Sequence, residues 1–542
     1  MLRRDALIAY LSMEVALESD IPTYAGGLGV LAGDLLRSAA DLGLRMVGVT
    51  LVHRRGYFRQ RLDPEGRQTT DPMQWAPERR LAVLEPRCHV SIDGRHVLVR
   101  AWRYDIQGIG GHVVPVLLLD TDLPENDAEA RRFTDELYGG DDHYRLCQEA
   151  VLGIGGVRML RALGYDDVQR FHLNEGHSAL LALELYTEAA AGLPHAAAAE
   201  RVRRSCVFTT HTPVPAGHDQ FPVAMAEKVL GAPQVDALRA LGCCGDRLNM
   251  TLVALRLSHW VNGVARSHGD VSSSMFPSYH IASITNGVHS ASWTSPPFAR
   301  LFDRHIPDWR RSSFTLRYAR SIPAEAVTAA HHEAKQLLVD AVNDRTGAGF
   351  HSHVFTLGFA RRATVYKRPT LIFHDAARLR QLAREAGGLQ LVFAGKAHPR
   401  DEAGQALIRT VLREGAELAP DIRLVWLPDY DMRLAQLITA GTDVWLNTPH
   451  PPEEASGTSG MKAAHNGVPS VSILDGWWWE GHLEGVTGWA VGAARRPRGM
   501  PREDGDDAEA TDSALQRDVL ASTLSACSTS TWCAPTTPRN SR

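Results

Sequence analysis

Lys462 is the residue whose type and setting most directly suggest chemistry. It is one of only five lysines among 58 basic residues, because arginine carries the positive charge almost everywhere else. Lysine can lose its proton and act as a nucleophile, whereas arginine stays charged and cannot form an imine. We therefore expect lysine to remain mainly where a guanidinium group cannot replace it.

The segment around this lysine is a loop of small residues that leads into a helix-compatible stretch. It reads Glu454-Ala-Ser-Gly-Thr-Ser-Gly-Met-Lys462-Ala-Ala-His-Asn-Gly467. Backbone N–H groups of such a loop, and the positive end of the helix after it, can bind a phosphate. A lysine beside a phosphate site suggests pyridoxal phosphate held as a Schiff base. By itself, the local pattern more often marks an ordinary helix start.

A cluster of cations follows the apolar run 354–359. Arg361, Arg362, Lys367 and Arg368 place four positive charges within eight residues. Isolated clusters of this kind are usually solvated surface. The C-terminal end of a parallel strand is, however, where such sheets bind ligands, so the position favours an anion site.

Two further segments follow strand-like runs. Tyr24-Ala-Gly-Gly-Leu-Gly-Val-Leu-Ala-Gly-Asp34 is rich in glycine, which lets the backbone approach an anion, although such loops are often only tight turns. His172-Leu-Asn-Glu-Gly-His177 contains a histidine, which in isolation is more often structural than catalytic.

Strands and helices, which must position these residues, are expected to alternate along the chain. Short apolar runs are separated by amphipathic stretches, which is the pattern of βα units on parallel sheets. We expect strands at 46–52, 113–119, 168–173, 207–210, 354–359, 389–394, 424–427 and 444–446, and helices at 178–190, 324–345, 377–386 and 401–417. The N-terminal run is expected to be a buried strand and not a signal peptide, because Ser12 and Glu14 interrupt it.

The length of 542 residues suggests two domains and additional segments. We expect an N-terminal Rossmann-like domain at 1–290 and a C-terminal one at 291–492, both doubly wound and facing a cleft. Residues 493–542 are expected to form a disordered tail, because they are acidic and then rich in Ser, Thr and Pro.

Bulk composition excludes several classes of function. A net charge of −4 and scattered arginines argue against a nucleic-acid-binding protein. No apolar stretch is long enough to span a bilayer, so we expect a soluble, cytoplasmic protein without membrane contact. Seven cysteines without a framework spacing fit a reducing cytosol. Cys243 and Cys244 are adjacent and no Cys-x-x-Cys pair occurs, so no metal site is expected.

The segment around Lys462, continued through Asp475-Gly-Trp-Trp-Trp-Glu480-Gly, resembles the cofactor-lysine motif of the α-glucan (glycogen, starch, maltodextrin) phosphorylases. The motif resembles the form found in the shorter bacterial members of this family. The glycine loop resembles the loop of this family that closes over the substrate phosphate, and it also matches starch and glycogen synthases. The matches run from about Leu7 to Gly492. The resemblance implies the glycosyltransferase-B fold.

The resemblance also implies roles for single residues. The implied catalytic residues are Lys462, Arg362, Lys367 and His177, with Arg362 and Lys367 holding inorganic phosphate. The implied cofactor-binding residues are Lys462, Thr458, Ser459, Arg361, Tyr430 and Trp293. The implied substrate-binding residues are Gly26, Gly27, His177, Asn286, Glu454, Ser456 and Gly457. Residues 209–219 and 249–251 match the family as well.

The reaction implied is reversible phosphorolysis of an α-1,4-glucan, such as glycogen or maltodextrin, to α-D-glucose 1-phosphate. The 5′-phosphate of pyridoxal phosphate would act as the proton relay. We find no clear carboxylate pair of the glycosidase kind, which agrees with this scheme. The resemblance leaves homo-oligomer formation and allosteric control open.

Two alternatives remain. A nucleotide-sugar glycosyltransferase of the same fold would explain the glycine loop and the cations, but not Lys462. The chain also begins close to its first sheet strand and departs from the family pattern after Gly492, which suggests a truncation or a frameshift. The second alternative is therefore an inactive, poorly stable remnant, because sheet faces would lack covering helices.

Overall fold

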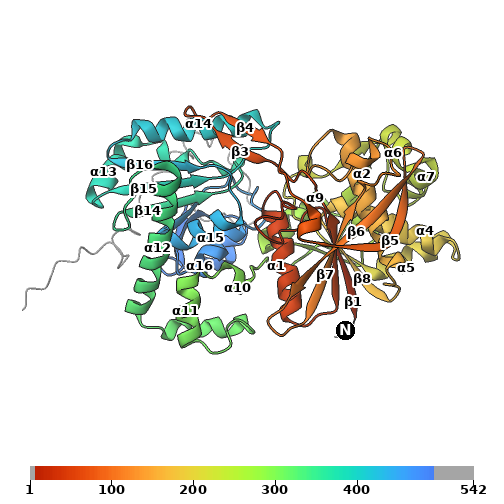
Figure 1. Ribbon diagram of the computed structural model, residues 1–542, viewed down its shortest axis with the longest axis horizontal. Coiled ribbons are helices and arrows are strands. Elements are labelled where there is room, and N and C mark those ends of the chain that lie inside the picture. Colours follow the sequence, from red (N-terminus) through yellow and green to blue (C-terminus); the bar gives the residue numbers. More distant parts are fainter. Residues whose placement is uncertain (1–5, 493–542) are drawn as a thin grey trace, which may run out of the picture. The chain divides into compact units, whose positions relative to one another are not determined.

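The computed structural model describes residues 6–492, and the expected tail at 493–542 lies outside the described residues (Figure 1). The described chain forms two compact units. Unit 1 contains residues 6–59 and 72–289, and unit 2 contains residues 60–71 and 290–492. The main division falls between His289 and Ser290. The assignment of residues 60–71 to unit 2 is not indicated by the sequence.

Unit 1 is built on a sheet with the strand order β13-β12-β9-β8-β1-β2-β7-β6-β5. Its strands are β1 (Leu7–Ser12), β2 (Met46–Leu51), β5 (Ala82–Ile92), β6 (Arg95–Gln107), β7 (Val113–Asp120), β8 (Val168–Asn174), β9 (Cys206–Thr209), β12 (Trp260–Gly263) and β13 (Ala282–Ser283). Neighbouring strands from β13 to β7 are parallel, whereas β6 and β5 run antiparallel. The order changes direction between β1 and β8.

The central strand β1 is buried on both faces of this sheet. Ala9 and Leu11 belong to one apolar cluster, whereas Tyr10 belongs to another. Burial on both faces is the usual state of parallel strands that are covered by helices. The helices of unit 1 are α1 (Gly27–Asp41), α2 (Asp142–Ala150), α3 (Gly156–Ala162), α4 (Leu180–Ala190), α5 (His195–Ser205), α6 (Val223–Leu230), α7 (Ala232–Ala240), α8 (Met250–Arg256) and α9 (Arg266–Met275). A short antiparallel pair, β10 (Gln220–Pro222) and β11 (Arg247–Asn249), lies outside the sheet.

Unit 2 has a fully parallel sheet with the order β16-β15-β14-β17-β18-β19. Its strands are β14 (Phe355–Ala360), β15 (Leu389–Ala394), β16 (Ile422–Leu427), β17 (Val444–Asn447), β18 (Ser470–Ile473) and β19 (Gly488–Val491). Its helices are α10 (Ser290–Trp293), α11 (Pro296–His305), α12 (Ala324–Thr346), α13 (Ala376–Glu385), α14 (Glu402–Glu417), α15 (Met432–Gly441), α16 (Thr458–Ala464) and α17 (Trp478–Gly481). The order changes direction between β14 and β17, and ligands of such sheets bind outside the strand ends at that point.

The segment 60–71 carries most of a small hairpin, β3 (Arg59–Leu62) and β4 (Gln68–Asp71), which is the orange element among the green and blue ribbons of Figure 1. The Gln60 side chain donates to the carbonyl of Gly395 (3.0 Å), and Gln68 donates to that of Ala397 (2.8 Å). Both acceptors follow β15. Side-chain amides thus fasten the hairpin to unit 2.

The expectation of an α/β protein with parallel sheets is confirmed. The long hairpin of β5 and β6 was not expected, because β5 alternates between exposed residues and half-buried or buried ones and offers no continuous apolar run. Within residues 6–492, no helix is both long enough and apolar enough to cross a membrane.

A buried ion cluster joins α12 to the sheet of unit 2. Asp443 lies at the start of β17 and accepts from Lys335 Nζ (2.5 Å), from His331 Nε2 (2.9 Å) and from the Thr356 N–H (2.7 Å). Burial raises the pKa of Asp443, but the charge of Lys335 and the contact with His331 outweigh it, and the pKa is lowered. The carboxylate is therefore ionised, and α12 depends on it.

We expect Asp443→Asn to destabilise the protein by about 3–5 kcal/mol, because it leaves the Lys335 charge buried without its counter-ion. Urea unfolding at neutral pH measures this loss. Asp340→Asn, on the exposed side of α12, is the matched control and should change stability by less than about 0.5 kcal/mol. Equal effects of the two substitutions would contradict the anchoring role of Asp443.

Candidate functional site

The loop that follows β17 is held in shape by two glycines. Gly457 precedes α16 with a φ of 88°, a left-handed conformation that favours glycine. Gly476 has a φ of 56°, and a Cβ there would lie 2.4 Å from the Ser456 carbonyl oxygen. The Trp477 N–H donates to that same oxygen (2.9 Å). The loop therefore packs backbone to backbone against the segment after β18.

The central contact of this loop is an ion triad. The Glu454 Oε2 atom accepts from Arg361 Nη2 (2.6 Å) and from Lys367 Nζ (2.5 Å), and all three side chains are buried. Burial raises the pKa of Glu454, but the charges of Arg361 and Lys367 outweigh burial and lower the pKa to about 2. The carboxylate is therefore ionised, and one net positive charge remains.

The triad and its hydrogen-bond partners lie at the carboxyl ends of β14, β17 and β18. Arg361 follows β14 and also bonds the side chain of Asn447, the last residue of β17. The Glu454 N–H donates to Asp475 (2.9 Å), which follows β18. These strands flank the point at which the sheet order changes direction. This is the edge at which a parallel sheet presents its ligand site.

Lys462 lies on α16 and is buried, with Nζ 4.0 Å from the ring centre of Trp293. The Asn466 side chain donates to the carbonyls of Trp293 (2.8 Å) and Lys462 (3.0 Å), and it accepts from the Ser295 N–H (2.8 Å). One amide group therefore fixes α16 to the segment that carries the tryptophan. The structure brings together two residues that are 169 positions apart and that the resemblance assigns to one cofactor.

The structure also describes the setting of other predicted residues of unit 2. Ser456 is buried, and its Oγ has no hydrogen-bond partner among the described residues. Ser459 accepts from Trp445 Nε1 (3.2 Å) and keeps its own hydroxyl hydrogen for another acceptor. Tyr430 is half-buried, whereas Arg362 is exposed. Thr458 is half-buried in the first turn of α16.

Gly26, Gly27, His177 and Asn286 belong to unit 1. Neither glycine has an atom within 4 Å of an added Cβ, so the loop faces open space there. The N–H groups of Ala25 and Gly26, however, donate to Glu14 Oε2 (2.6 and 3.2 Å). The Glu14 carboxylate thus already accepts from two of the backbone N–H groups that were expected to bind an anion. The Asn286 N–H donates to the carbonyl of Val264 (3.0 Å).

His177 takes part in a second ionic cluster. Its Nε2 lies 3.2 Å from Asp219 Oδ2 and 2.9 Å from Arg145 Nη2, which itself donates to Asp219 (2.9 Å). Burial and the charge of Asp219 raise the pKa of Glu149 well above its usual range. Burial also raises the pKa of Asp219, but His177 and Arg145 outweigh it and lower the pKa. The two carboxyl groups therefore differ in their tendency to bind a proton, with Glu149 binding it more readily than Asp219.

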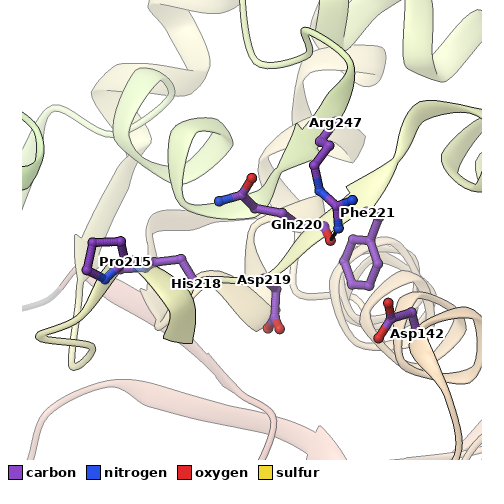
Figure 2. A pocket seen from close by; sticks show the side chains of 7 residues that line it. All are labelled: Asp142, Pro215, His218, Asp219, Gln220, Phe221 and Arg247. Atoms are coloured by element: carbon purple, nitrogen blue, oxygen red, sulfur yellow. Dashed lines mark hydrogen bonds between the residues drawn. The ribbon is translucent and has the colours of Figure 1, made fainter.

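A cavity of about 380 Å³ opens beside this second cluster and not beside Lys462. Figure 2 shows its lining side chains, which are Asp142, Pro215, His218, Asp219, Gln220, Phe221 and Arg247. His218 is buried, and its Nδ1 lies 2.9 Å from Thr251 Oγ1. Burial lowers the pKa of His218. The cavity thus places a neutral imidazole and a carboxylate on one polar wall.

Several residues of these clusters were not singled out from the sequence. They are Glu14, Arg145, Glu149, Asn447 and Asp475. Arg145 and Glu149 carried a usable signal, because opposite charges four positions apart share one helix face. Glu14 bonds N–H groups 11 and 12 positions away, Asp475 bonds one 21 positions away and Asn447 bonds a side chain 86 positions away, and none of these separations is a helical or strand spacing.

The chain is similar to proteins of one enzyme family. A family model described as carbohydrate phosphorylase matches residues 234–480. Maltodextrin phosphorylase of Thermococcus litoralis is 36% identical over 556 aligned positions, which cover 95% of this chain and 66% of that protein. Glycogen phosphorylase of Mycobacterium tuberculosis is 40% identical over 546 positions, covering 90% and 62%. Glycogen phosphorylase of Aquifex aeolicus is 34% identical over 561 positions, covering 95% and 79%.

The chain therefore spans just under two thirds of the length of the Thermococcus and Mycobacterium proteins. It spans more than three quarters of the Aquifex protein.

We expect Glu454→Gln to lower the stability of the protein by about 3 kcal/mol at pH 7, because two buried cations lose their counter-ion. The folded pKa of about 2 lies below the unfolded value. The stabilisation is therefore complete above about pH 5 and is lost as the pH falls toward 2. Urea unfolding of both proteins between about pH 3 and 8 measures the difference.

Glu453→Gln is the control, since Glu453 pairs only with the exposed His450 among the described residues. It should change stability by less than about 0.5 kcal/mol. A Glu454→Gln difference that stays constant through the acid range would show that Glu454 does not stabilise the fold as a carboxylate.

Proposed function

Because this chain belongs to the carbohydrate phosphorylase family, we propose that it is an α-glucan phosphorylase. The proposed reaction is the reversible transfer of a terminal glucosyl unit from an α-1,4-glucan, such as glycogen or maltodextrin, to inorganic phosphate. The product is α-D-glucose 1-phosphate. The observation that carries the proposal is the buried Lys462 over Trp293, on the helix that follows the loop of Glu454, whose carboxylate pairs with Arg361 and Lys367.

We further propose the glycosyltransferase-B fold, with Rossmann-like domains at residues 1–290 and 291–492. The parallel sheets support it, and so does the strand order of unit 2, which changes direction between β14 and β17. A cytoplasmic location stays a prediction from the composition, and homo-oligomer formation and allosteric control stay open.

The residues around Lys462 fit pyridoxal phosphate as the cofactor. A buried lysine amine is the group that this cofactor requires, and the Trp293 ring offers an apolar surface beside it. Ser456 has a buried hydroxyl without a partner among the described residues, and the Ser459 hydroxyl keeps a hydrogen to donate. We assign Lys462 to the attachment of the cofactor. Thr458, Ser459 and Arg361 would hold its phosphate, and Tyr430 and Trp293 would pack beside it.

When bound, this cofactor supplies a phosphate group that titrates near neutrality and can exchange a proton. The protein supplies binding and charge. Arg362, exposed at the end of β14, and Lys367 would bind inorganic phosphate, and their charges would stabilise negative charge as the glycosidic bond breaks.

We assign the glucosyl unit to Glu454, Ser456 and Gly457 in unit 2 and to Gly26, Gly27, His177 and Asn286 in unit 1. Both cations of the triad bond Oε2 of Glu454, which leaves Oε1 without a bond from the described residues and able to accept from a sugar hydroxyl. The His177 imidazole, oriented by Asp219, can hydrogen-bond a sugar hydroxyl group. Family membership favours this reaction over a nucleotide-sugar transfer.

We expect Lys462→Arg to abolish retention of the cofactor, because a guanidinium group keeps the charge but cannot condense with an aldehyde. After borohydride treatment of the wild-type protein loaded with pyridoxal phosphate, peptide mapping should find the pyridoxyl label on Lys462. Lys396→Arg is the control, since Lys396 forms an ion pair with Asp429 (2.7 Å) that arginine can replace. A label on Lys367 or Lys396 would refute the assignment.

We expect Arg362→Ala to raise the phosphate concentration needed for half-maximal activity by about tenfold or more, because a charge-assisted contact contributes about 1.5–3 kcal/mol. Cofactor content should not change. Lys367→Ala should act in the same direction and should also lower stability, since Lys367 is part of the triad. Arg423→Ala, on the exposed side of β16, is the control. Unaltered phosphate dependence in both variants would show that these cations do not bind the substrate phosphate.

A further inference from the structure

Three residues with metal-ligating side chains meet in unit 1, apart from the residues assigned above. His143 and Cys147 lie four positions apart on α2, so their side chains share one face of the helix. Asp93 lies in the turn between β5 and β6, where it has a φ of 52° and its N–H donates to the Val229 carbonyl (3.1 Å). The turn and the helix thus bring together a carboxylate, an imidazole and a thiol.

One imidazole nitrogen faces both of the other groups. His143 Nε2 lies 3.1 and 3.0 Å from the two carboxylate oxygens of Asp93 and 3.9 Å from Cys147 Sγ. The ligand atoms of the three residues all lie within 4.8 Å of one another. Around tetrahedral zinc, N and O ligands are about 3.3 Å apart and N and S ligands about 3.6 Å apart. Small side-chain rotations would therefore place all three at bonding distance from one ion.

The charges around the cluster suit a cation. Arg95 pairs with Asp93 (3.0 Å), but the same guanidinium group also pairs with Asp127 and Glu129 (3.0 Å each). Three carboxylates thus surround one arginine.

Asp93 and His143 are partly exposed, so an ion can enter, whereas Cys147 is buried.

We propose that Asp93, His143 and Cys147 form a zinc-binding site. Mixed nitrogen, sulfur and oxygen ligands are those that zinc accepts, and three protein ligands leave one position for water. On binding, the Cys147 thiol loses its proton to solvent as the zinc–sulfur bond forms. The ion would fasten the β5–β6 turn to α2. This assignment is independent of the proposed phosphorylase activity.

Zinc binding by the full chain tests the proposal. After removal of metals with a chelator, the wild-type protein should take up about one equivalent of zinc and release about one proton from the thiol. It should also unfold at a higher temperature with zinc than without. Cobalt in place of zinc should give a thiolate-to-cobalt charge-transfer band in the difference spectrum. Cys147→Ser should abolish that band and weaken zinc binding by about tenfold or more.

Cys88→Ser is the matched control, because Cys88 lies on β5 with its thiol 3.5 Å from the Gly155 carbonyl and outside the cluster. It should bind zinc like the wild type. His143→Gln is a second ligand variant at a partly exposed position, for use if Cys147→Ser does not fold. No zinc uptake by the wild type, or equal uptake by wild type and ligand variants, would overturn the proposal.

Discussion

The ionised carboxylate of Glu454 is the contact on which the arrangement of unit 2 depends. Two cations can be buried at the strand ends only because this anion lies between them, since an uncompensated charge in a low-dielectric interior is strongly unfavourable. Through Arg361, Asn447 and Asp475 the same contact fixes the ends of β14 and β17 and the segment after β18. These contacts hold the strand ends together without a bound ligand.

The remaining charge of the triad bears on anion binding. Arg361, Lys367 and Glu454 together carry one net positive charge, which is less than a phosphate dianion needs. The exposed Arg362 adjoins this group in the sequence and adds a second positive charge. This charge balance agrees with the assignment of substrate phosphate to Arg362 and Lys367, which the family resemblance implies. The glycine loop of unit 1 has less capacity than its sequence suggests, because Glu14 already accepts two of the loop's N–H groups.

The rarity of lysine in this sequence does not by itself identify a nucleophilic lysine. Lys335, Lys367 and Lys396 each pair with a single carboxylate, those of Asp443, Glu454 and Asp429. At the buried positions of Lys335 and Lys367, a compact ammonium group suits the site better than a planar guanidinium group. In a sequence with few lysines, a lysine can therefore occupy an ion-pair position as well as the position of a nucleophile. An aromatic contact does not set Lys462 apart, because Lys462 Nζ lies 4.0 Å from the ring centre of Trp293 and Lys367 Nζ lies 4.4 Å from that of Tyr366. Lys228 is exposed on α6.

The sequence predicts those parts of the fold that depend on local pattern. Strand β15 has its predicted bounds, and α12 differs by one residue, because buried strands and long helices leave contiguous signals. The hairpin at 60–71 was missed, since its Gln68 bonds a residue 329 positions away. The sequence also shows that Glu454 and Lys462 belong to one segment. It does not reveal the partners of Glu454, because Arg361 and Lys367 lie 93 and 87 positions away. The cluster around His143 was missed because Asp93 is 50 positions from it.

The central claim is phosphorolysis, and its most direct test is product analysis. The purified full chain, loaded with pyridoxal phosphate, would be incubated with maltodextrin at increasing concentrations of inorganic phosphate. The account predicts glucose 1-phosphate in amounts that rise with phosphate, and chain extension when glucose 1-phosphate and a primer are supplied. Absence of glucose 1-phosphate, or release of free glucose regardless of phosphate, would contradict it.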